Sequence, residues 1–352
     1  MYSFKNDYSE GAHPQILQAL SATNLEQTDG YGEDVFSLQA IASIREIIGR
    51  NDIDVHLLSG GTQTNLTALS AFLRPHEAII SANTGHILVH ETGAIEATGH
   101  KIISMETSDG KIGSEHIQAA LDNHTDEHMV KPKLVYISNP TEIGTHYTKS
   151  ELALVSKFCR QEGLYLYLDG ARLGSALCVK DSDLKLSDLA ALVDAFYIGG
   201  TKNGALLGEA LVICNDRLKE DFRFHLKQKG ALLAKGRVLG LQFRELFQDN
   251  LYFELAEHAN AMAAILHEAI RNAGYTFLTQ SSTNQIFPIL PNWLIEQLQQ
   301  NYAFYIWSKV DTTHSAVRLV TSWATPLQAV HAFISDMNGF IAGNTTSQKI
   351  QS

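Results

Sequence analysis

The sequence predicts an α/β protein with a large domain built on a mostly parallel, seven-stranded sheet and a smaller C-terminal α+β domain. Two patterns lead to this prediction. Between Val55 and Cys214, short apolar runs alternate with segments of helical period, as in βαβ units around a buried parallel sheet. After Cys214, consecutive helical segments replace this alternation, as expected for a second domain in a chain of 352 residues.

The strands of the large domain are predicted from short apolar runs that end at glycines or polar residues. Segments with one apolar face separate several of them and predict helices. The strands are expected at Val55–Ser59, Ala78–Ser81, Lys101–Met105, Lys133–Ser138, Leu164–Asp169, Ala195–Gly199 and Ala210–Cys214, and the helices at Thr64–Leu73, near Thr92–Thr98 and at Lys149–Glu162.

The C-terminal part predicts three helices and then a mixture of strands and helices. The expected elements are helices Arg217–Lys227, Leu232–Phe247 and Leu251–Asn272, strand Gln285–Leu290, helix Trp293–Gln300, strands Phe304–Lys309 and Val317–Thr321, and helix Leu327–Phe340. The predicted divisions are an N-terminal segment at 1–20, the large domain at 21–248, the small domain at 249–343 and a polar, disordered tail at 344–352.

Composition excludes several classes of partner. Lys and Arg total 27 against 38 Asp and Glu, a net charge of −11, so neither nucleic acid nor an anionic membrane is expected to bind. The low charged fraction, 18%, fits a chain that hides surface in an oligomer. The three cysteines form no C-x-x-C pair, and the start has no signal-peptide pattern, so a reducing cytoplasm is expected.

A glycine-rich turn, Ser59–Asn65 (S-G-G-T-Q-T-N), lies between a predicted strand and a predicted helix. Backbone N–H groups at a helix N-terminus, with the Thr62 hydroxyl, can hold a phosphate. The turn is neither a Walker A loop nor G-x-G-x-x-G. An ordinary βα turn is the plainer interpretation.

Two further motifs follow buried strands, at the edge where open parallel sheets bind ligands. In Tyr167–Arg172, Asp169 could pair with a protonated ring nitrogen and Arg172 with a carboxylate, although an ion pair and helix cap would also explain them. In Ile198–Gly204, Lys202 lies among glycines, and burial would make its amine a nucleophile. A solvated loop lysine is the alternative.

Two isolated residues complete the set. His86 follows a predicted strand and could stack on a planar cofactor or move a proton. His90 lies four residues later, so the two histidines, with Glu91, could bind the metal ion of a metal-dependent hydrolase, and this alternative stays open. The H-E-x-x-H order of zinc proteases is absent, however, and no metal is predicted. Arg318 lies inside an apolar strand and needs a carboxylate partner, from substrate or from the protein.

Taken in order, these features resemble the threonine aldolase and aromatic amino acid β-eliminating lyase family of fold-type I pyridoxal 5′-phosphate (PLP) enzymes, over nearly the whole chain. The resemblance is strongest to the branch of phenylserine aldolases and low-specificity L-threonine aldolases. The motifs are N-D-Y-S-E-G-A-H-P at Asn6–Pro14, Y-G-E-D at Tyr31–Asp34, T-E-I-G-T-H-Y-T at Thr141–Thr148 and T-K-N-G at Thr201–Gly204.

The resemblance implies an aspartate aminotransferase-like fold, a PLP cofactor and a role for each site residue. Lys202 would bond covalently to PLP, Asp169 would hold its ring nitrogen, and His86 would stack on the ring and act in proton transfer. The implied cofactor-binding residues are Gly61, Thr62, Gln63, His86, Asp169, Arg172, Thr201, Lys202 and Tyr31, the last from a neighbouring subunit, and the implied substrate-binding residues are Arg172, Arg318 and Asn6.

The resemblance further implies retro-aldol cleavage of L-β-hydroxy-α-amino acids to glycine and an aldehyde, in a homodimer or homotetramer with shared active sites. Three departures bear on this. The histidine that follows an E-N-T run in classical threonine aldolases has no counterpart in Ser138–Glu142, T-K-N-G replaces S-K-G, and Asn6 replaces an amino-terminal serine. β-Elimination, racemisation and a catalytically silent PLP-binding protein are the alternatives on this scaffold.

Overall fold

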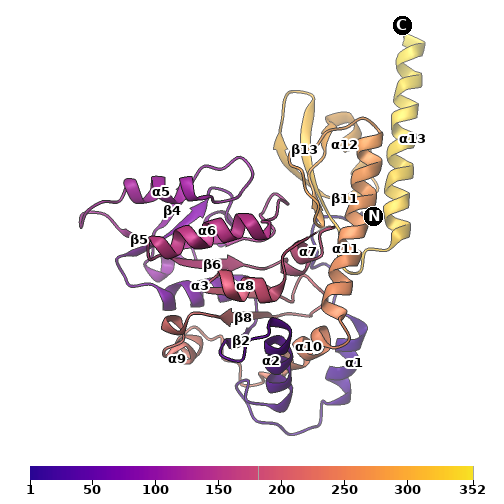
Figure 1. The fold of residues 1–352 in the computed structure, drawn as a ribbon. Coiled ribbons are helices and arrows are strands. Elements are labelled where there is room, and N and C mark those ends of the chain that lie inside the picture. The colour runs from indigo at the N-terminus through magenta and orange to yellow at the C-terminus, as the bar shows by residue number, and fades with distance from the viewer. Residues whose placement is uncertain (181, 352) are drawn as a thin grey trace.

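The computed structural model describes residues 1–180 and 182–351, with side chains described up to residue 344. It consists of a central sheet flanked by helices, a smaller sheet beside it, and a long C-terminal helix that runs along the smaller part (Figure 1).

The central sheet has seven strands in the order β2-β8-β7-β6-β5-β3-β4. Only β8 runs antiparallel to its neighbours, so the prediction of a mostly parallel seven-stranded sheet is confirmed. The strands are β2 (Asp54–Leu58), β3 (Glu77–Ala82), β4 (Ile102–Met105), β5 (Lys131–Ser138), β6 (Tyr165–Asp169), β7 (Ala195–Gly199) and β8 (Glu209–Ile213).

Both faces of this sheet are covered, which is why its strands are continuous apolar runs. Alternate residues enter two separate hydrophobic clusters: Leu166 and Leu168 of β6 belong to one, and Tyr167 to the other. The helices around the sheet are α1 (Pro14–Ala22), α2 (Val35–Ile48), α3 (Gly61–Phe72), α4 (His86–Val89), α5 (Ser114–Asp122), α6 (Lys149–Gln161), α7 (Leu173–Leu177), α8 (Leu186–Leu192), α9 (Phe222–Gln228) and α10 (Arg237–Phe247), with 3-10 turns η1 (Glu96–Thr98) and η2 (Asp216–Leu218).

Helix α11 (Leu251–Asn272) connects the two cores, since Tyr252 packs in a cluster of the central sheet and Leu266 in the cluster of the smaller part. The chain start also joins the smaller part, because Phe4 is buried in that cluster. The remaining elements are β1 (Tyr2–Ser3), β9 (Gln285–Ile286), β10 (Ile289–Pro291), α12 (Asn292–Leu298), β11 (Tyr302–Ala303), β12 (Tyr305–Lys309), β13 (His314–Val320) and α13 (Leu327–Gln351).

Residues with positive φ interrupt two helices expected from the sequence, one of which is split and the other shortened. The helix expected at Arg217–Lys227 is split into η2 and α9, because Asp221 adopts a left-handed conformation with φ of 55°. The helix expected near Thr92–Thr98 shortens to η1, because Thr92 and Gly93 both have positive φ.

Three other boundaries differ from expectation. The helix expected from Leu232 begins at Arg237, because the preceding loop packs against another loop and Ala234 O accepts a hydrogen bond from Tyr31 N (3.2 Å). The strand expected at Gln285–Leu290 divides around Pro288, which has no N–H to donate. Helix α13 extends past Phe340 into the predicted tail. Side chains from residue 345 onward and all of Ser352 lie outside the described part of the chain, so the disorder expected for the tail stays a prediction.

No helix within the described residues is long and apolar enough to cross a membrane.

Candidate active site

Asp169 forms the floor of the candidate site at the carboxyl end of β6. Period-2 alternation puts its side chain on the same face as Tyr167, towards α3, and it is only 3% exposed. Its Oδ2 accepts hydrogen bonds from Tyr136 Oη (2.6 Å) and Asn65 Nδ2 (3.0 Å), and its Oδ1 accepts one from Tyr197 Oη (2.5 Å). Tyr136, Tyr197 and Asn65 come from β5, β7 and α3, so three elements besides β6 fix this one carboxylate.

The buried Asp169 is held in its charged form. Burial alone would raise its pKa, but the nearby charge of His86 and the hydrogen bonds from Tyr136, Tyr197 and Asn65 bring the pKa below its usual value. A permanent carboxylate at the edge of a parallel sheet is suited to hold a positively charged ring nitrogen.

Changing Asp169 to asparagine tests this function. Asparagine retains a hydrogen-bond acceptor but removes the negative charge, so turnover is expected to fall about 10²- to 10³-fold, as for other lost electrostatic contacts. Steady-state kinetics and the visible spectrum of the bound cofactor would measure the change. Unchanged turnover would contradict the proposed role of the carboxylate.

His86 is the first residue of α4 and is oriented by Glu91. Its Nδ1 lies 2.8 Å from Glu91 Oε1, and the same oxygen accepts a hydrogen bond from Asn65 Nδ2 (2.8 Å). Asn65 therefore links His86, through Glu91, to Asp169. Burial lowers the pKa of His86, but the Glu91 hydrogen bond and the charges of Glu142 and Asp169 outweigh it and raise the pKa above its usual value.

The predicted phosphate cradle is the N-terminus of α3, which begins at Gly61 after Gly60. No side chain caps this end, so its first N–H groups are available. A Cβ on Gly61 would lie 3.2 Å from Tyr197 Oη, so a larger residue would crowd the tyrosine that donates a hydrogen bond to Asp169. Thr62 is exposed, and Gln63 Oε1 accepts a hydrogen bond from Ser59 Oγ (2.7 Å), which ties the turn together.

Lys202 lies on a tight loop after β7, facing the same edge. Burial and the charge of Arg172 together lower its pKa, which favours the nucleophilic neutral amine. The Thr201 hydroxyl accepts a hydrogen bond from Gly208 N (3.0 Å), closing the loop onto β8. Beneath it, Glu209 accepts a hydrogen bond from Gly200 N (3.1 Å), and burial raises the pKa of Glu209 to about 8.

Arg172 already has a carboxylate partner within the chain. Its Nε and Nη2 donate to the two oxygens of Asp7, at 2.6 and 3.0 Å, and Asn284 Nδ2 donates to Asp7 as well (2.9 Å). The Asp7 side chain is 1% exposed and that of Arg172 9%. While this pair persists, a substrate carboxylate can reach only the N–H groups of Arg172 that Asp7 does not occupy.

Arg318 reaches the site from β13 and retains more free hydrogen-bonding capacity. Its Nη2 donates to Lys5 O (3.2 Å), its Nε is buried without a partner among the described residues, and its guanidinium packs over Tyr305 and Trp307. Asn6 lies in the same N-terminal segment, where its Oδ1 accepts hydrogen bonds from Tyr8 N and Ser9 Oγ.

Tyr31 makes its contacts away from the other predicted site residues. It is 43% exposed, its ring packs under Lys227 Nζ (4.5 Å), and its carbonyl accepts a hydrogen bond from Arg223. The exposure fits a residue that contacts another subunit.

Asp7, Glu91 and Asn65, with Tyr136 and Tyr197, are site residues that the pattern analysis did not assign to the site. Asp7 stood within the N-D motif and Glu91 beside His90, so motif membership was the only signal for them. The two tyrosines looked like ordinary strand residues, because only the folded sheet brings their hydroxyls to Asp169.

These residues fit PLP by their chemistry. A buried carboxylate suits the ring nitrogen, a buried amine suits the aldehyde carbon, and an uncapped helix N-terminus suits the phosphate. Among the described residues, no group of three or more His, Cys, Asp or Glu side chains could hold a metal ion.

Comparisons with known proteins agree with this arrangement. The beta-eliminating lyase family matches residues 6–291. The low specificity L-threonine aldolase of Pseudomonas aeruginosa is 30% identical over 338 residues, which cover 95% of this chain and 96% of the relative. A solved structure of Leishmania major threonine aldolase is 50% identical, with a TM-score of 0.96 and coverage of 97% of this chain and 100% of that chain.

More distant structures share the fold alone. Histidinol-phosphate aminotransferase of Clostridium acetobutylicum superposes with a TM-score of 0.73 at 14% identity, covering 97% of this chain and 99% of that chain. The family match over most of the chain, the similar threonine aldolases and the shared fold lead to one conclusion. The chain belongs to the threonine aldolase and β-eliminating lyase family of fold-type I, PLP-dependent lyases.

Proposed function

We propose that the protein cleaves L-β-hydroxy-α-amino acids of the threonine, allo-threonine and phenylserine type into glycine and an aldehyde. The observation that carries the proposal is the convergence of Lys202, Asp169 and His86 at one sheet edge, in a chain whose full-length relatives include threonine aldolases. Bound PLP would supply the electron sink that stabilises the negative charge left on Cα when the Cα–Cβ bond breaks.

The chain's own residues would set up that cleavage. Lys202 holds the cofactor until an amino acid takes its place, Asp169 keeps the ring nitrogen positively charged, and the N-terminus of α3 anchors the phosphate. His86, fixed by Glu91, supports the ring face. Arg318 and the N–H groups of Arg172 that Asp7 does not occupy orient the substrate carboxylate, which decides which Cα bond lines up for cleavage.

Several finer features belong to the same proposal. We infer a cytoplasmic homo-oligomer, a dimer or tetramer, in which Tyr31 of one subunit approaches the phosphate of its neighbour. The exposed ring of Tyr31 and the exposed side chains of Leu25 (92%) and Phe224 (75%) support a contact between subunits. The free cysteines Cys159, Cys178 and Cys214 are compatible with a reducing compartment.

The products distinguish the proposal from its alternatives. Holoenzyme is incubated with L-threo-phenylserine, L-allo-threonine and L-alanine, and glycine, aldehyde, ammonia, keto acid and D-isomers are measured. Equimolar glycine and aldehyde are expected. Ammonia with keto acid would instead assign β-elimination, which the matched family's description also allows, and D-alanine would assign racemisation.

Arg318 gives a prediction about substrate binding. Arg318→Ala removes a charged hydrogen-bond donor worth about 1.5–3 kcal/mol, so KM for L-allo-threonine is expected to rise about ten- to a hundred-fold. Cofactor absorbance should stay unchanged. Arg271→Ala, at the exposed end of α11, is the control. A normal KM in Arg318→Ala would remove Arg318 from the substrate site.

A further inference from the structure

We propose that Glu142 is the general base that takes the proton from the β-hydroxyl group of the substrate. This inference rests on the proposed function, because only cleavage of a β-hydroxy amino acid requires such a base. It assigns to a carboxylate a step for which the sequence allowed His86, or a water that His86 orients, without deciding the base.

Glu142 lies beside the groups that would surround the substrate. It follows β5, whose last residue Ser138 pairs with Asp169 across the sheet. Its charge acts on His86, Lys202, Arg172 and Arg318. With Gly85 and Tyr136, Glu142 lines a small cavity next to the first turn of α4. The carboxylate therefore lies within electrostatic reach of the lysine, the histidine and the two arginines.

The backbone around Glu142 is held firmly. Residues 141–144 form a tight turn with Glu142 at its second position, closed by a hydrogen bond from Gly144 N to Thr141 O (3.0 Å). Gly144 has a φ of 83°, and a Cβ there would lie 2.5 Å from Ser281 Oγ, so only glycine fits.

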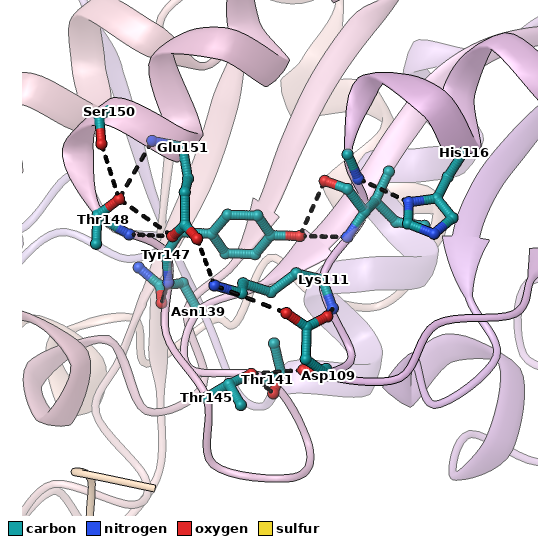
Figure 2. A network of polar contacts seen from close by, with 12 residues as sticks. Asp109, Lys111, His116, Asn139, Thr141, Thr145, Tyr147, Thr148, Ser150 and Glu151 are labelled. Carbon is teal, nitrogen blue, oxygen red and sulfur yellow. Dashed lines mark hydrogen bonds and ion pairs between the residues drawn. The ribbon is translucent and has the colours of Figure 1, made fainter. Parts of the chain in front are cut away.

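Side chains fasten the same turn on both sides. Thr145 Oγ1 lies 2.7 Å from Thr141 Oγ1 and donates to Asp109 O (2.6 Å), and Figure 2 shows these three residues close together. On the other side Thr279 Oγ1 donates to Ile143 O (2.6 Å). A base on such a fixed turn is already positioned when substrate arrives.

The carboxylate itself is not engaged. Among the described residues, Glu142 has no hydrogen-bond or ion-pair partner, and its side chain is half-buried. The other acidic groups here have partners: Asp169 accepts from three side-chain donors, Asp7 pairs with Arg172, and Glu91 Oε1 contacts His86 and Asn65, while the buried Glu91 Oε2 has no partner among the described residues. His86 is suited to support the ring face. Burial lowers its pKa, but the hydrogen bond to Glu91 outweighs burial and raises the pKa, which makes the neutral, proton-accepting imidazole less favoured.

The step balances without another reactant. A Glu142 oxygen accepts the β-hydroxyl proton, and the O–H electron pair becomes the second C–O bond of the aldehyde. The Cα–Cβ bond breaks and its electron pair stays on Cα, stabilised by the bound cofactor. Protonation of Cα then gives glycine, and Glu142 returns its proton to solvent, so no net proton is consumed.

The test compares Glu142→Gln, Glu142→Asp and the control Glu127→Gln in holoenzyme. Glu127 is an exposed carboxylate before β5, at the opposite end of that strand. The readouts are kcat with L-threo-phenylserine, glycine affinity from the cofactor spectrum, and exchange of the glycine α-hydrogen with D₂O. Glycine binding and exchange involve no β-hydroxyl group, so a base for that group does not affect them.

Glu142→Gln is expected to lower kcat about 10²-fold or more, while glycine affinity and hydrogen exchange stay within about two-fold of wild type. Glu142→Asp is expected to recover part of kcat. Glu127→Gln is expected to match wild type. Wild-type kcat in Glu142→Gln would overturn the proposal. Equal losses of glycine binding and exchange would also overturn it, by assigning Glu142 a structural role. If wild type itself releases no aldehyde, the proposed function fails first.

Discussion

Replacing Lys202 with alanine is expected to remove essentially all catalysis. The amine is buried, its pKa is lowered by burial and by Arg172, and no second lysine among the described residues is placed beside Asp169. Loss of the covalent attachment point should reduce kcat/KM by at least about 10⁴-fold, as for other lost nucleophiles. The absorbance band of covalently bound cofactor should vanish even with excess PLP.

A lysine outside the site controls for indirect effects. Lys157 is exposed on α6, so Lys157→Ala should retain both band and turnover. Circular dichroism of Lys202→Ala should match wild type, because removing a buried amine relieves a desolvation cost. A Lys202→Ala protein that kept the band would show that another residue holds the cofactor.

Asp7→Ala is expected to be the most destabilising single change at the site. It leaves Arg172 buried without its counter-charge, and breaking a buried ion pair by removing one partner typically costs about 3–5 kcal/mol. Urea unfolding would measure the loss. Activity should fall too, because the freed Arg172 and the segment that carries Asp7 both border the candidate site.

The double variant Asp7→Ala/Arg172→Leu separates charge from packing. Because both charges are gone, it should regain much of the stability lost in Asp7→Ala. Asp126→Ala, an exposed carboxylate, is the single-site control. If Asp7→Ala unfolds like the control, the Asp7–Arg172 pair contributes nothing to the fold.

The effect of Asp7 also has a definite pH dependence. Burial would raise its pKa, but the charges of Arg172 and Lys202 lower it below the usual 3.8. A carboxyl group with a lowered folded-state pKa stabilises the protein fully above its unfolded pKa. The contribution of Asp7 is therefore lost only as the pH falls below about 3.8 towards the folded value.

Buried strands and long helices were the easiest elements to predict. Ala195–Gly199 and Leu251–Asn272 have the predicted bounds, because a strand covered on both faces is one apolar run and a long helix repeats its apolar face many times. The helix at Val35–Ile48 was not predicted, because small residues between its apolar positions weaken the pattern.

The site was predictable where one residue carries distinct chemistry, and not where several residues act together. Lys202 and Asp169 stand out as a lysine among glycines and an acid after an apolar strand. The partners of Asp169 come from β5, β7 and α3, and Asp7 meets Arg172 across 165 positions of sequence. No local pattern encodes such distances, so only the folded chain reveals these contacts.

The central claim, that Lys202 holds PLP in this site, is tested most directly by reducing the holoenzyme with borohydride and mapping the modified peptide by mass spectrometry. Reduction makes the bond between lysine and cofactor permanent. The account predicts a single pyridoxyl group, on the peptide that contains Lys202. A pyridoxyl group on any other lysine, or none on a protein that binds PLP, would contradict it.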